Sequence, residues 1–324
     1  MSPLLAQIPP PPSAGLEIGP LDLRLYGVLI AVGAYLALRL ATRRYAALGG
    51  DEEVAERTAL WVLGAGFVGA RIGYVLPRLT SGGPGGEGFL ADPLAIPAIW
   101  QGGLALFGGL FFGTLAGILV ARRSQADIPA LADAIAPGVP LAQAIGRWGN
   151  YFNQELYGRP TDVPWALEVD PRFRRPGFED EATFHPTFLY ESLANLLLFV
   201  VLLRLDRTGR LRRGSLLFCY AIGYGIIRAA TESLRIDTAE RYLGLSRNNW
   251  IAIVVVLVGA AGLYWWQTRG RDGDGSAAED GDAARADEDD EADDADDGDD
   301  GDGPAPSDGS APDGADSEDG TRGD

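Results

Sequence analysis

The chain has 324 residues and a formal net charge of −18, with 27 basic against 45 acidic residues. Residues 271–324 hold 23 acidic and 3 basic residues, so residues 1–270 are almost neutral. The single cysteine, Cys219, excludes a disulfide framework and a cysteine-cluster metal site, and the single histidine, His185, excludes a histidine-rich metal centre.

Apolar stretches along residues 20–268 predict a membrane protein. A transmembrane helix needs about 20 mostly apolar residues, and six separate runs of this kind argue against a soluble helical core. A weaker run contains Asp133, Pro137 and Pro140, and we count it because neighbouring helices can satisfy an interrupted backbone. The predicted spans cover residues 25–38, 58–76, 104–120, 128–146, 186–203, 214–230 and 250–266. We expect an all-α integral membrane bundle of seven transmembrane helices with a small outer-face head.

Arginines in the connections predict the orientation of this bundle. They are densest after the first, third, fifth and last spans, and long segments count less in the positive-inside rule. The N-terminus is therefore expected outside and the C-terminus in the cytoplasm. We divide the chain into a Pro-rich outer segment (1–19), a seven-span domain (20–268) and a disordered acidic tail (269–324). The tail has almost no large apolar side chains, and we favour a solvated extension over an interaction tail.

Charged residues inside the predicted spans are candidates for function because burying a charge in a membrane is costly. There are five of them: Arg71, Asp133, Glu191, Arg228 and Glu232. The last two lie on the same helix face as Tyr224, at i, i+4 and i+8. Arg228 and Glu232 could form a purely structural pair, or the arginine could hold a phosphate, because its fork matches two phosphate oxygens. Spacing alone leaves both open.

The segment at residues 146–159 concentrates polar groups beside a membrane. Its sequence is GRWGNYFNQELYGR, which combines guanidinium, amide and carboxylate side chains with three glycines. One interpretation is an interfacial loop with aromatic anchors. The other is a headgroup-binding site at the outer end of the fourth span.

This segment closely resembles the signature of the bacterial phosphatidylglycerol–prolipoprotein diacylglyceryl transferase family. Other parts agree in order: Tyr26 in the first span, QGGLALFGG at residues 101–109, HPTFLYE at 185–191, and the 224–232 helix face. The resemblance covers roughly residues 20–268. It implies an enzyme of the bacterial cell membrane that transfers a diacylglyceryl group from phosphatidylglycerol to the lipobox cysteine of a preprolipoprotein. The products are a thioether and glycerol phosphate.

The resemblance also implies no metal or organic cofactor, no nucleic acid, and a monomer that acts near the outer leaflet. Arg147 and Arg228 are expected to stabilise the phosphate charge in a dry site. Glu232 is expected to orient Arg228, and Glu155 to orient Arg147 or Arg159. The expected substrate-binding residues are Asn150 as a headgroup donor, Gly158 for close backbone approach, and Tyr26 and Tyr224 at the headgroup.

One position departs from the pattern that the resemblance suggests. Many members have a histidine, commonly regarded as the base for the thiol, where this chain has Gln101. The base could be His185, or a carboxylate such as Glu155 or Glu232. Alternatively the thiol, with a normal pKa of about 8.5, ionises without a dedicated base. We favour the last alternative, with Gln101 binding the headgroup; His185 could equally be a helix-start residue before Pro186.

Two other classes of function compete with this interpretation. A lipid-binding scaffold that lost its activity would explain Gln101, although the intact set of Arg147, Asn150, Arg228 and Glu232 argues against it. A small-solute transporter would tolerate polar residues at depth, but the sequence lacks a matching pair of broken spans in two halves.

Overall fold

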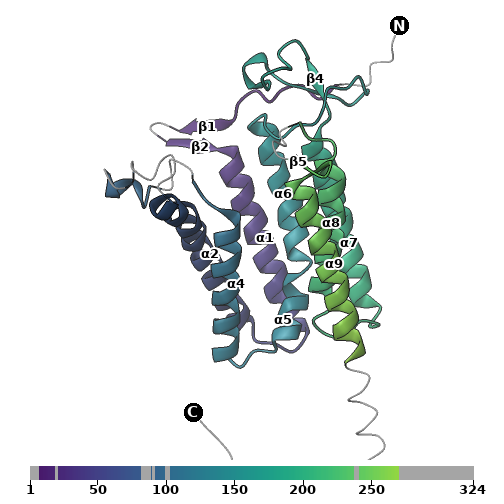
Figure 1. The fold of residues 1–324 in the computed structure, drawn as a ribbon. Coiled ribbons are helices and arrows are strands. Elements are labelled where there is room, and N and C mark those ends of the chain that lie inside the picture. The colour runs from purple at the N-terminus through teal and green to yellow at the C-terminus, as the bar shows by residue number, and fades with distance from the viewer. Residues whose placement is uncertain are drawn as a thin grey trace, which may run out of the picture. The chain divides into compact units, whose positions relative to one another are not determined.

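The computed structural model describes residues 7–18, 21–81, 89, 92–98, 103–236 and 241–269. Long helices dominate this part of the chain, and Figure 1 shows them running roughly along one direction. They are α1 (Leu25–Ala47), α2 (Glu52–Ser81), α4 (Leu106–Arg123), α5 (Ile128–Ile135), α6 (Gly138–Phe152), α7 (Thr187–Arg207), α8 (Leu216–Glu232) and α9 (Arg247–Thr268). The predicted outer segment 1–19 is described only from residue 7 to 18, and the predicted tail beyond residue 269 lies outside the described residues.

Six segments of the described chain are long and apolar enough to cross a membrane. One of them, Ile128–Phe152, comprises α5 and α6 with a break at Pro137, where the missing N–H interrupts the helix. The sequence predicts seven spans, and the region predicted as the sixth is α8, which has only 17 residues. At 1.5 Å per residue, α8 is about 26 Å long, slightly less than a hydrocarbon core of about 30 Å.

Glycines bring α2 and α4 into close contact along most of their length. A methyl group at Gly108 would overlap the carbonyl oxygen of Gly69, and one at Gly113 would lie 3.1 Å from the carbonyl oxygen of Val62. Small residues at such positions let helix backbones approach in lipid, where packing replaces the hydrophobic effect as the driving force. These glycines therefore form the seam of the α2–α4 pair.

Helix α1 contacts α2, α5 and α6, so the α2–α4 pair lies beside the rest of the bundle (Figure 1). Helix α1 runs against α6, where Gly33 lies so close to Ala142 that a Cβ would meet its carbonyl oxygen at 3.0 Å. Helix α7 joins α6 to α8, and α8 packs on α9. As a result, α6, α7 and α8 bring together three segments that are far apart in sequence.

Two of the five charges in the predicted spans have structural roles. The carboxylate of Asp133 accepts hydrogen bonds from the backbone N–H of Gly214, at 2.6 Å, and of Leu216, at 2.8 Å, at the start of α8. Arg71 donates to the carbonyl oxygens of Ala95, Ile96 and Gly103, and so ties α2 to the connection before α4. Both charges satisfy backbone groups that would otherwise be orphaned in an apolar setting.

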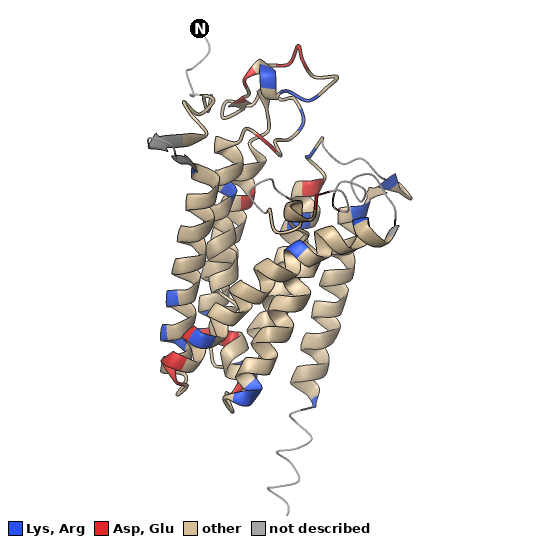
Figure 2. Cartoon of the chain, turned by 90° about the vertical axis from the view of Figure 1, so that its left-hand side faces the viewer, with Lys and Arg blue, Asp and Glu red and all other residues tan. Residues whose placement is uncertain are grey.

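A layer of short elements covers the end of the bundle where α6 ends and α7 begins. It contains the two-residue strands β3 (Leu167–Glu168) and β4 (Thr183–Phe184), which pair antiparallel. Tyr157, Leu167, Val169, Phe184 and Phe188 form its apolar core. The hairpins β1 (Gly15–Ile18) with β2 (Leu21–Arg24), and β5 (Arg241–Tyr242) with β6 (Leu245–Ser246), precede α1 and α9. Figure 2 shows charged residues gathered at both ends and few between them.

Candidate functional site

A buried glutamate joins two arginines at the end of the bundle near this layer. Glu191 on α7 is only 2% exposed. One carboxylate oxygen lies 2.5 Å from Nη2 of Arg147 on α6, and the other lies 3.6 Å from Nη1 of Arg228 on α8. The packing of α6, α7 and α8 therefore places three of the charged residues singled out from the sequence in one cluster.

Glu232 completes this cluster from the last turn of α8. Its carboxylate lies 2.6 Å from Nη2 of Arg228, so the i, i+4 pair considered from the sequence is present. The other oxygen accepts hydrogen bonds from Ser246 Oγ at 3.0 Å and Asn248 Nδ2 at 2.9 Å, both at the start of α9. Two arginines and two glutamates give the cluster no net charge, which makes its burial tolerable.

One hydrogen-bond donor in this cluster, on Arg228, has no acceptor among the described residues. Arg228 Nη1 is buried and makes no hydrogen bond with the described residues, because its distance to Glu191 exceeds normal hydrogen-bond length. A buried guanidinium N–H without an acceptor is costly. It is therefore a group that an anionic ligand could satisfy after a small rearrangement.

Asn150 links Arg147 to a second glutamate. Its side-chain oxygen accepts from Arg147 Nη1 at 3.4 Å, and its amide donates to Glu155 Oε1 at 2.9 Å. Asn153 also donates to Glu155 Oε1, at 3.1 Å. The sequence predicts that Glu155 orients Arg147 or Arg159; in the structure Asn150 hydrogen-bonds to both Glu155 and Arg147.

The backbone after α6 turns sharply to bring Glu155 back to Asn150. Gln154 and Leu156, on either side of Glu155, have φ values of 50° and 60°, which residues other than glycine rarely adopt. Hydrogen bonds hold this strained turn: the Gln154 side chain accepts from the N–H of Asp170 at 2.9 Å, and the Leu156 carbonyl accepts from Thr187 Oγ1 at 2.5 Å. Strain of this kind gathers at functional sites, where the surroundings enforce it.

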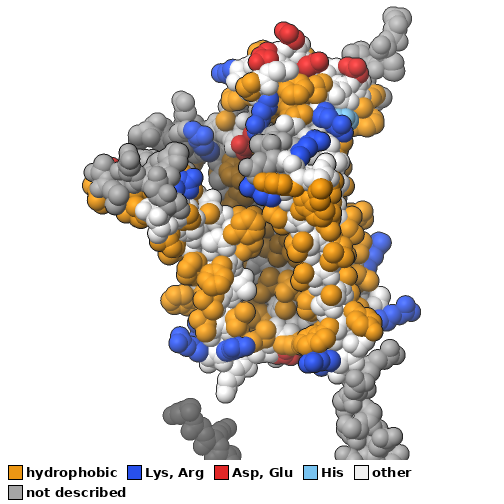
Figure 3. Space-filling view, in the orientation of Figure 1, with side chains coloured by type: hydrophobic (Ala, Val, Ile, Leu, Met, Phe, Trp, Pro, Cys, Tyr) orange, Lys and Arg blue, Asp and Glu red, His pale blue; other side chains and the backbone are white. Residues whose placement is uncertain are grey.

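A cavity of about 400 Å³ opens beside Arg147 and Asn150, within the size range of small-molecule sites. Figure 3 shows a hollow lined by hydrophobic side chains between the α2–α4 pair and the helices on its right. Helices α1, α4, α6 and α8 contribute the lining residues: Tyr26, Ile30, Ala34, Leu106, Val139, Ala142, Gln143, Gly146, Arg147, Asn150 and Tyr224. Thus Tyr26, Arg147, Asn150 and Tyr224, singled out from the sequence, share one wall of mixed polar and apolar character.

The glycines of the 146–159 segment explain how Tyr26 reaches this wall. The ring of Tyr26 lies directly on Gly149, where a methyl group would overlap it, and Ile30 lies against Gly146 in the same way. Only a residue without a side chain allows α1 to approach α6 so closely here. Gly146 and Gly149 therefore set how closely α1 packs on α6 beside the cavity.

Two residues expected at the site, Gly158 and His185, lie in the covering layer and not at the cavity wall. Gly158 packs inside the covering layer, where a Cβ would lie 2.8 Å from His185 Cβ and 3.0 Å from the Leu234 carbonyl oxygen. His185 Nδ1 lies 3.2 Å from the Tyr190 hydroxyl, and burial together with the charge of Arg159 lowers its pKa. Gln101 lies outside the described residues.

Glu191 and Gln143 belong to the site, although little in the sequence indicated this. Glu191 was noted only as a charge in a span, and its place between Arg147 and Arg228 is set by packing. Gln143 lines the cavity, and its amide donates to the Tyr220 hydroxyl at 2.9 Å. The position of Gln143 one helical turn before Arg147 was the only signal in the sequence for it.

The described residues contain no group of three or more His, Cys, Asp or Glu side chains placed to hold a metal ion. The chemistry that the arrangement can perform is binding and charge stabilisation. Arg147 and Asn150 place a guanidinium and an amide group in the wall of a largely apolar cavity. Preorganised donors in such surroundings stabilise developing negative charge strongly.

Comparisons with known proteins give the same family as the sequence motifs. A family model described as prolipoprotein diacylglyceryl transferase matches residues 13–265. The chain is 42% identical to phosphatidylglycerol–prolipoprotein diacylglyceryl transferase 2 of Streptomyces coelicolor, over 78% of each chain. It is 45% identical to the transferase of Frankia alni, over 79% of this chain and 66% of that protein. The transferase of Streptomyces griseus is 40% identical, over 78% of this chain and 76% of its own length.

Proposed function

The chain belongs to the prolipoprotein diacylglyceryl transferase family, and we propose that its cavity between α1, α4, α6 and α8 binds phosphatidylglycerol. The enzyme transfers the diacylglyceryl group of this lipid to the cysteine thiol of a preprolipoprotein, the first step of lipoprotein maturation. The single observation that carries the site assignment is Arg147, which lines an otherwise largely apolar cavity and is held by a buried glutamate.

The reaction needs charge stabilisation at the leaving group. The thiolate sulfur attacks the glyceryl carbon that bears the phosphate, a C–S bond forms, and the C–O bond to phosphate breaks. Glycerol phosphate leaves with the electron pair, and the thiol proton passes to solvent or to the departing phosphate. Negative charge therefore grows on phosphate oxygens, which is where a guanidinium is most useful.

Arg147 and Arg228 are proposed to supply this stabilisation. Arg147 does so from the cavity wall, and Arg228 through its unused Nη1 and its hold on Glu191. Asn150 donates to the headgroup, Glu155 holds Asn150, and Glu232 holds Arg228. Tyr26, Tyr224 and Gln101 are proposed to contact the headgroup, and Gly158 and His185 to support the covering layer.

We propose that the substrate thiol ionises without a dedicated base. The three enzyme groups considered for this task are otherwise engaged. His185 is next to Tyr190, Glu232 is held by Arg228 and two side chains of the α9 start, and Glu155 is held by two asparagine amides. A nearby positive guanidinium also favours the thiolate over the thiol.

The topology proposed for this enzyme has seven spans, with α8 as the sixth, the N-terminus outside and the acidic C-terminal tail in the cytoplasm. The arginines in the last turns of α1 and α4, and those that follow α7 and α9, support this orientation. The covering layer and the cavity then face the outer leaflet. The protein is proposed to act there as a monomer in the bacterial cell membrane.

A transfer assay tests this function. Purified protein in detergent receives phosphatidylglycerol and a fluorescent lipobox peptide, and product is read by mass; the Cys→Ser peptide is the control. Product from the cysteine peptide alone is expected. No product, from folded protein that binds the lipid, would instead favour a lipid-binding scaffold.

Arginine variants test the site. Arg147→Ala and Arg228→Ala are each expected to lower transfer by about 100-fold or more, the usual loss when one preorganised donor is removed. Arg147→Lys is expected to restore little, because an ammonium cannot make the two-pronged contact. A folded variant with near-normal rates would remove the phosphate-stabilising role of that arginine.

A further inference from the structure

A second hollow lies between α2 and α4, away from the cavity described above. It is a groove of about 520 Å³ and shares no lining residue with the cavity. Leu106, at the first residue of α4, lines the cavity, whereas Arg123, at the last residue, lines the groove. These positions are about 25 Å apart along a helix, so the groove lies at the opposite end of the bundle.

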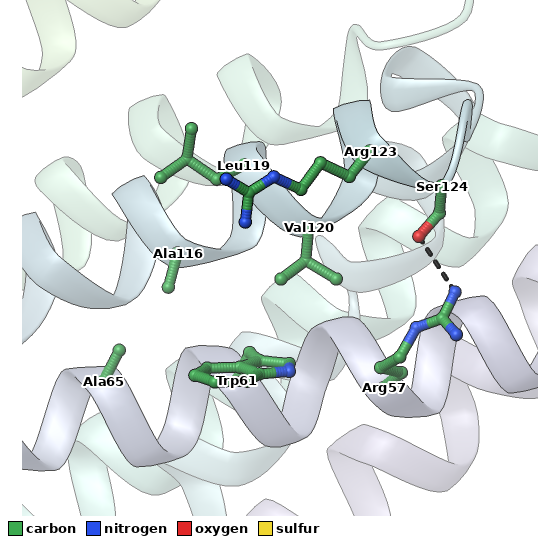
Figure 4. Close-up of a pocket in the computed structure, with 8 residues that line it drawn as sticks. All are labelled: Arg57, Trp61, Ala65, Ala116, Leu119, Val120, Arg123 and Ser124. Carbon is green, nitrogen blue, oxygen red and sulfur yellow. Dashed lines mark hydrogen bonds between the residues drawn. The ribbon is translucent and has the colours of Figure 1, made fainter.

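The glycine seam between α2 and α4 explains why a groove forms here. Helix contact at Gly66, Gly113 and Gly117 holds the two backbones close together. Beside that seam, Ala65 and Ala116 are too small to fill the space between the helices. Figure 4 shows these two alanines facing each other across the groove, which leaves an apolar channel along the pair.

The end of the channel is built from one aromatic ring and two arginines. The ring of Trp61 lies between the helices, below Val120, as Figure 4 shows. Arg57 donates from Nη2 to Ser124 Oγ at 2.9 Å, which fixes its guanidinium against the end of α4. The side chain of Arg123 runs along α4 over the same channel. Trp and Arg together are typical of the boundary between the hydrocarbon core and the headgroups.

These two arginines differ from three others at this end of the bundle. Arg39, Arg44 and Arg213 each form an ion pair with a carboxylate, at 3.4, 3.0 and 3.2 Å. Among the described residues, neither Arg57 nor Arg123 has a carboxylate within ion-pair distance, and both are exposed. The groove therefore carries two positive charges that the described part of the chain does not balance.

We infer that this groove binds one anionic phospholipid from the leaflet at the Arg57–Arg123 end of the bundle. An acyl chain lies in the channel beside Ala65, Ala116 and Trp61, and the lipid phosphate sits between the two guanidinium groups. The apolar channel accounts for the lipid tail, and the unbalanced positive charge selects an anionic over a zwitterionic headgroup. This site is separate from the proposed transferase cavity and does not supply its substrate.

The expected preference follows from the two charges. A basic side chain at an anionic membrane surface strengthens binding by about 5-fold, so the pair gives about 30-fold. Because Arg57 and Arg123 are exposed, salt weakens this preference, and most of it is lost when the Debye length shrinks to about 3 Å at 1 M salt.

Quenching of Trp61 by brominated lipids tests the inference. The full-length protein is reconstituted in phosphatidylcholine vesicles that contain either dibrominated phosphatidic acid or dibrominated phosphatidylcholine. Subtracting the signal of Trp61→Phe isolates quenching in the groove from that of the other tryptophans. Phosphatidic acid is expected to quench Trp61 at a mole fraction about 30-fold lower than phosphatidylcholine does.

Matched variants separate a specific site from general attraction. In Arg57→Gln/Arg123→Gln the preference is expected to disappear, whereas in Arg122→Gln, which removes a neighbouring exposed charge outside the groove, it remains. Equal quenching by both lipids, or an unchanged preference in the double variant, would overturn the inference. If the double variant does not fold, the salt dependence of the unmodified protein decides. A lipid preference that salt does not weaken would also overturn the inference.

Transfer activity of the unmodified protein is measured in the same phosphatidylcholine vesicles after phosphatidylglycerol and the lipobox peptide are added. Normal transfer without a lipid preference at Trp61 would refute the lipid site in the groove and leave the proposed transferase function intact. The two proposals therefore fail independently.

Discussion

Glu191→Gln removes the one negative charge that Arg147 and Arg228 share. Glu191 is 2% exposed, and its two oxygens lie 2.5 Å and 3.6 Å from the two guanidinium groups. Breaking a buried ion pair by removing one partner costs about 3–5 kcal/mol. Since the side chains of Arg147 and Arg228 remain 21% and 18% exposed and Gln can still accept one hydrogen bond, we expect the lower end, about 3 kcal/mol.

Two measurements follow from this substitution. The melting temperature in detergent is expected to fall by about 6–12 °C, the usual shift for 3 kcal/mol in a domain of this size. At a temperature where the variant is folded, kcat is expected to fall by about 100-fold, because Arg147 is no longer held against the cavity. The KM for phosphatidylglycerol is expected to stay level or fall, since the site gains net positive charge.

The exposed Glu181→Gln in the covering layer is the matched control, because it makes the same chemical change without breaking a buried pair. Its stability and kinetics are expected to equal those of the unmodified protein. A Glu191→Gln enzyme whose kcat is within about 2-fold of normal would refute the idea that Glu191 positions Arg147. An increase in KM at constant kcat would refute it too, since that pattern reports lost ground-state binding.

Three further predictions concern the surroundings of the site. Gly149→Ala is expected to displace the ring of Tyr26 and lower kcat/KM by about 10-fold or more, whereas Gly27→Ala, which has open space, changes little. His185→Gln is expected to leave the pH profile of transfer between pH 6 and 8 unchanged, because His185 packs in the covering layer and not at the cavity wall. Burial lowers the pKa of His185. The unfolded chain then binds more protons than the folded one, so this histidine makes stability rise with pH up to about 6.5, and melting curves at pH 5.5 and 7.5 check this. Deletion of residues 271–324 is expected to preserve transfer in the same assay, and a large loss would show a role for the tail.

Hydropathy was sufficient to predict a helical membrane protein, because the length and apolar character of a span are local properties of the chain. It predicted the positions of the long helices well and was less secure at α8, whose 17 residues are marginal for a span. Local polarity also identified the 146–159 segment. A run of guanidinium and amide side chains next to an apolar span is visible in the sequence and indicates a polar site. The family followed from the motifs and agrees with the comparisons.

The sequence treated five charges in spans alike, and the tertiary structure separated them. Asp133 and Arg71 satisfy backbone groups, whereas Glu191, Arg228 and Glu232 form one cluster with Arg147. No pattern within a helix distinguishes these outcomes, because every partner except the i, i+4 pair lies on another element.

The same reason explains why two residues of the sequence motifs lie away from the cavity wall. Gly158 and His185 fall within matching motifs, yet the structure packs them against each other in the covering layer. Sequence by itself determined which segments are apolar and long enough to span a membrane and which polar groups they carry, since both are local properties of the chain. Only the tertiary structure decided which of those groups share the cavity, because the packing of α6 against α1 and α7 brings together residues more than 40 positions apart.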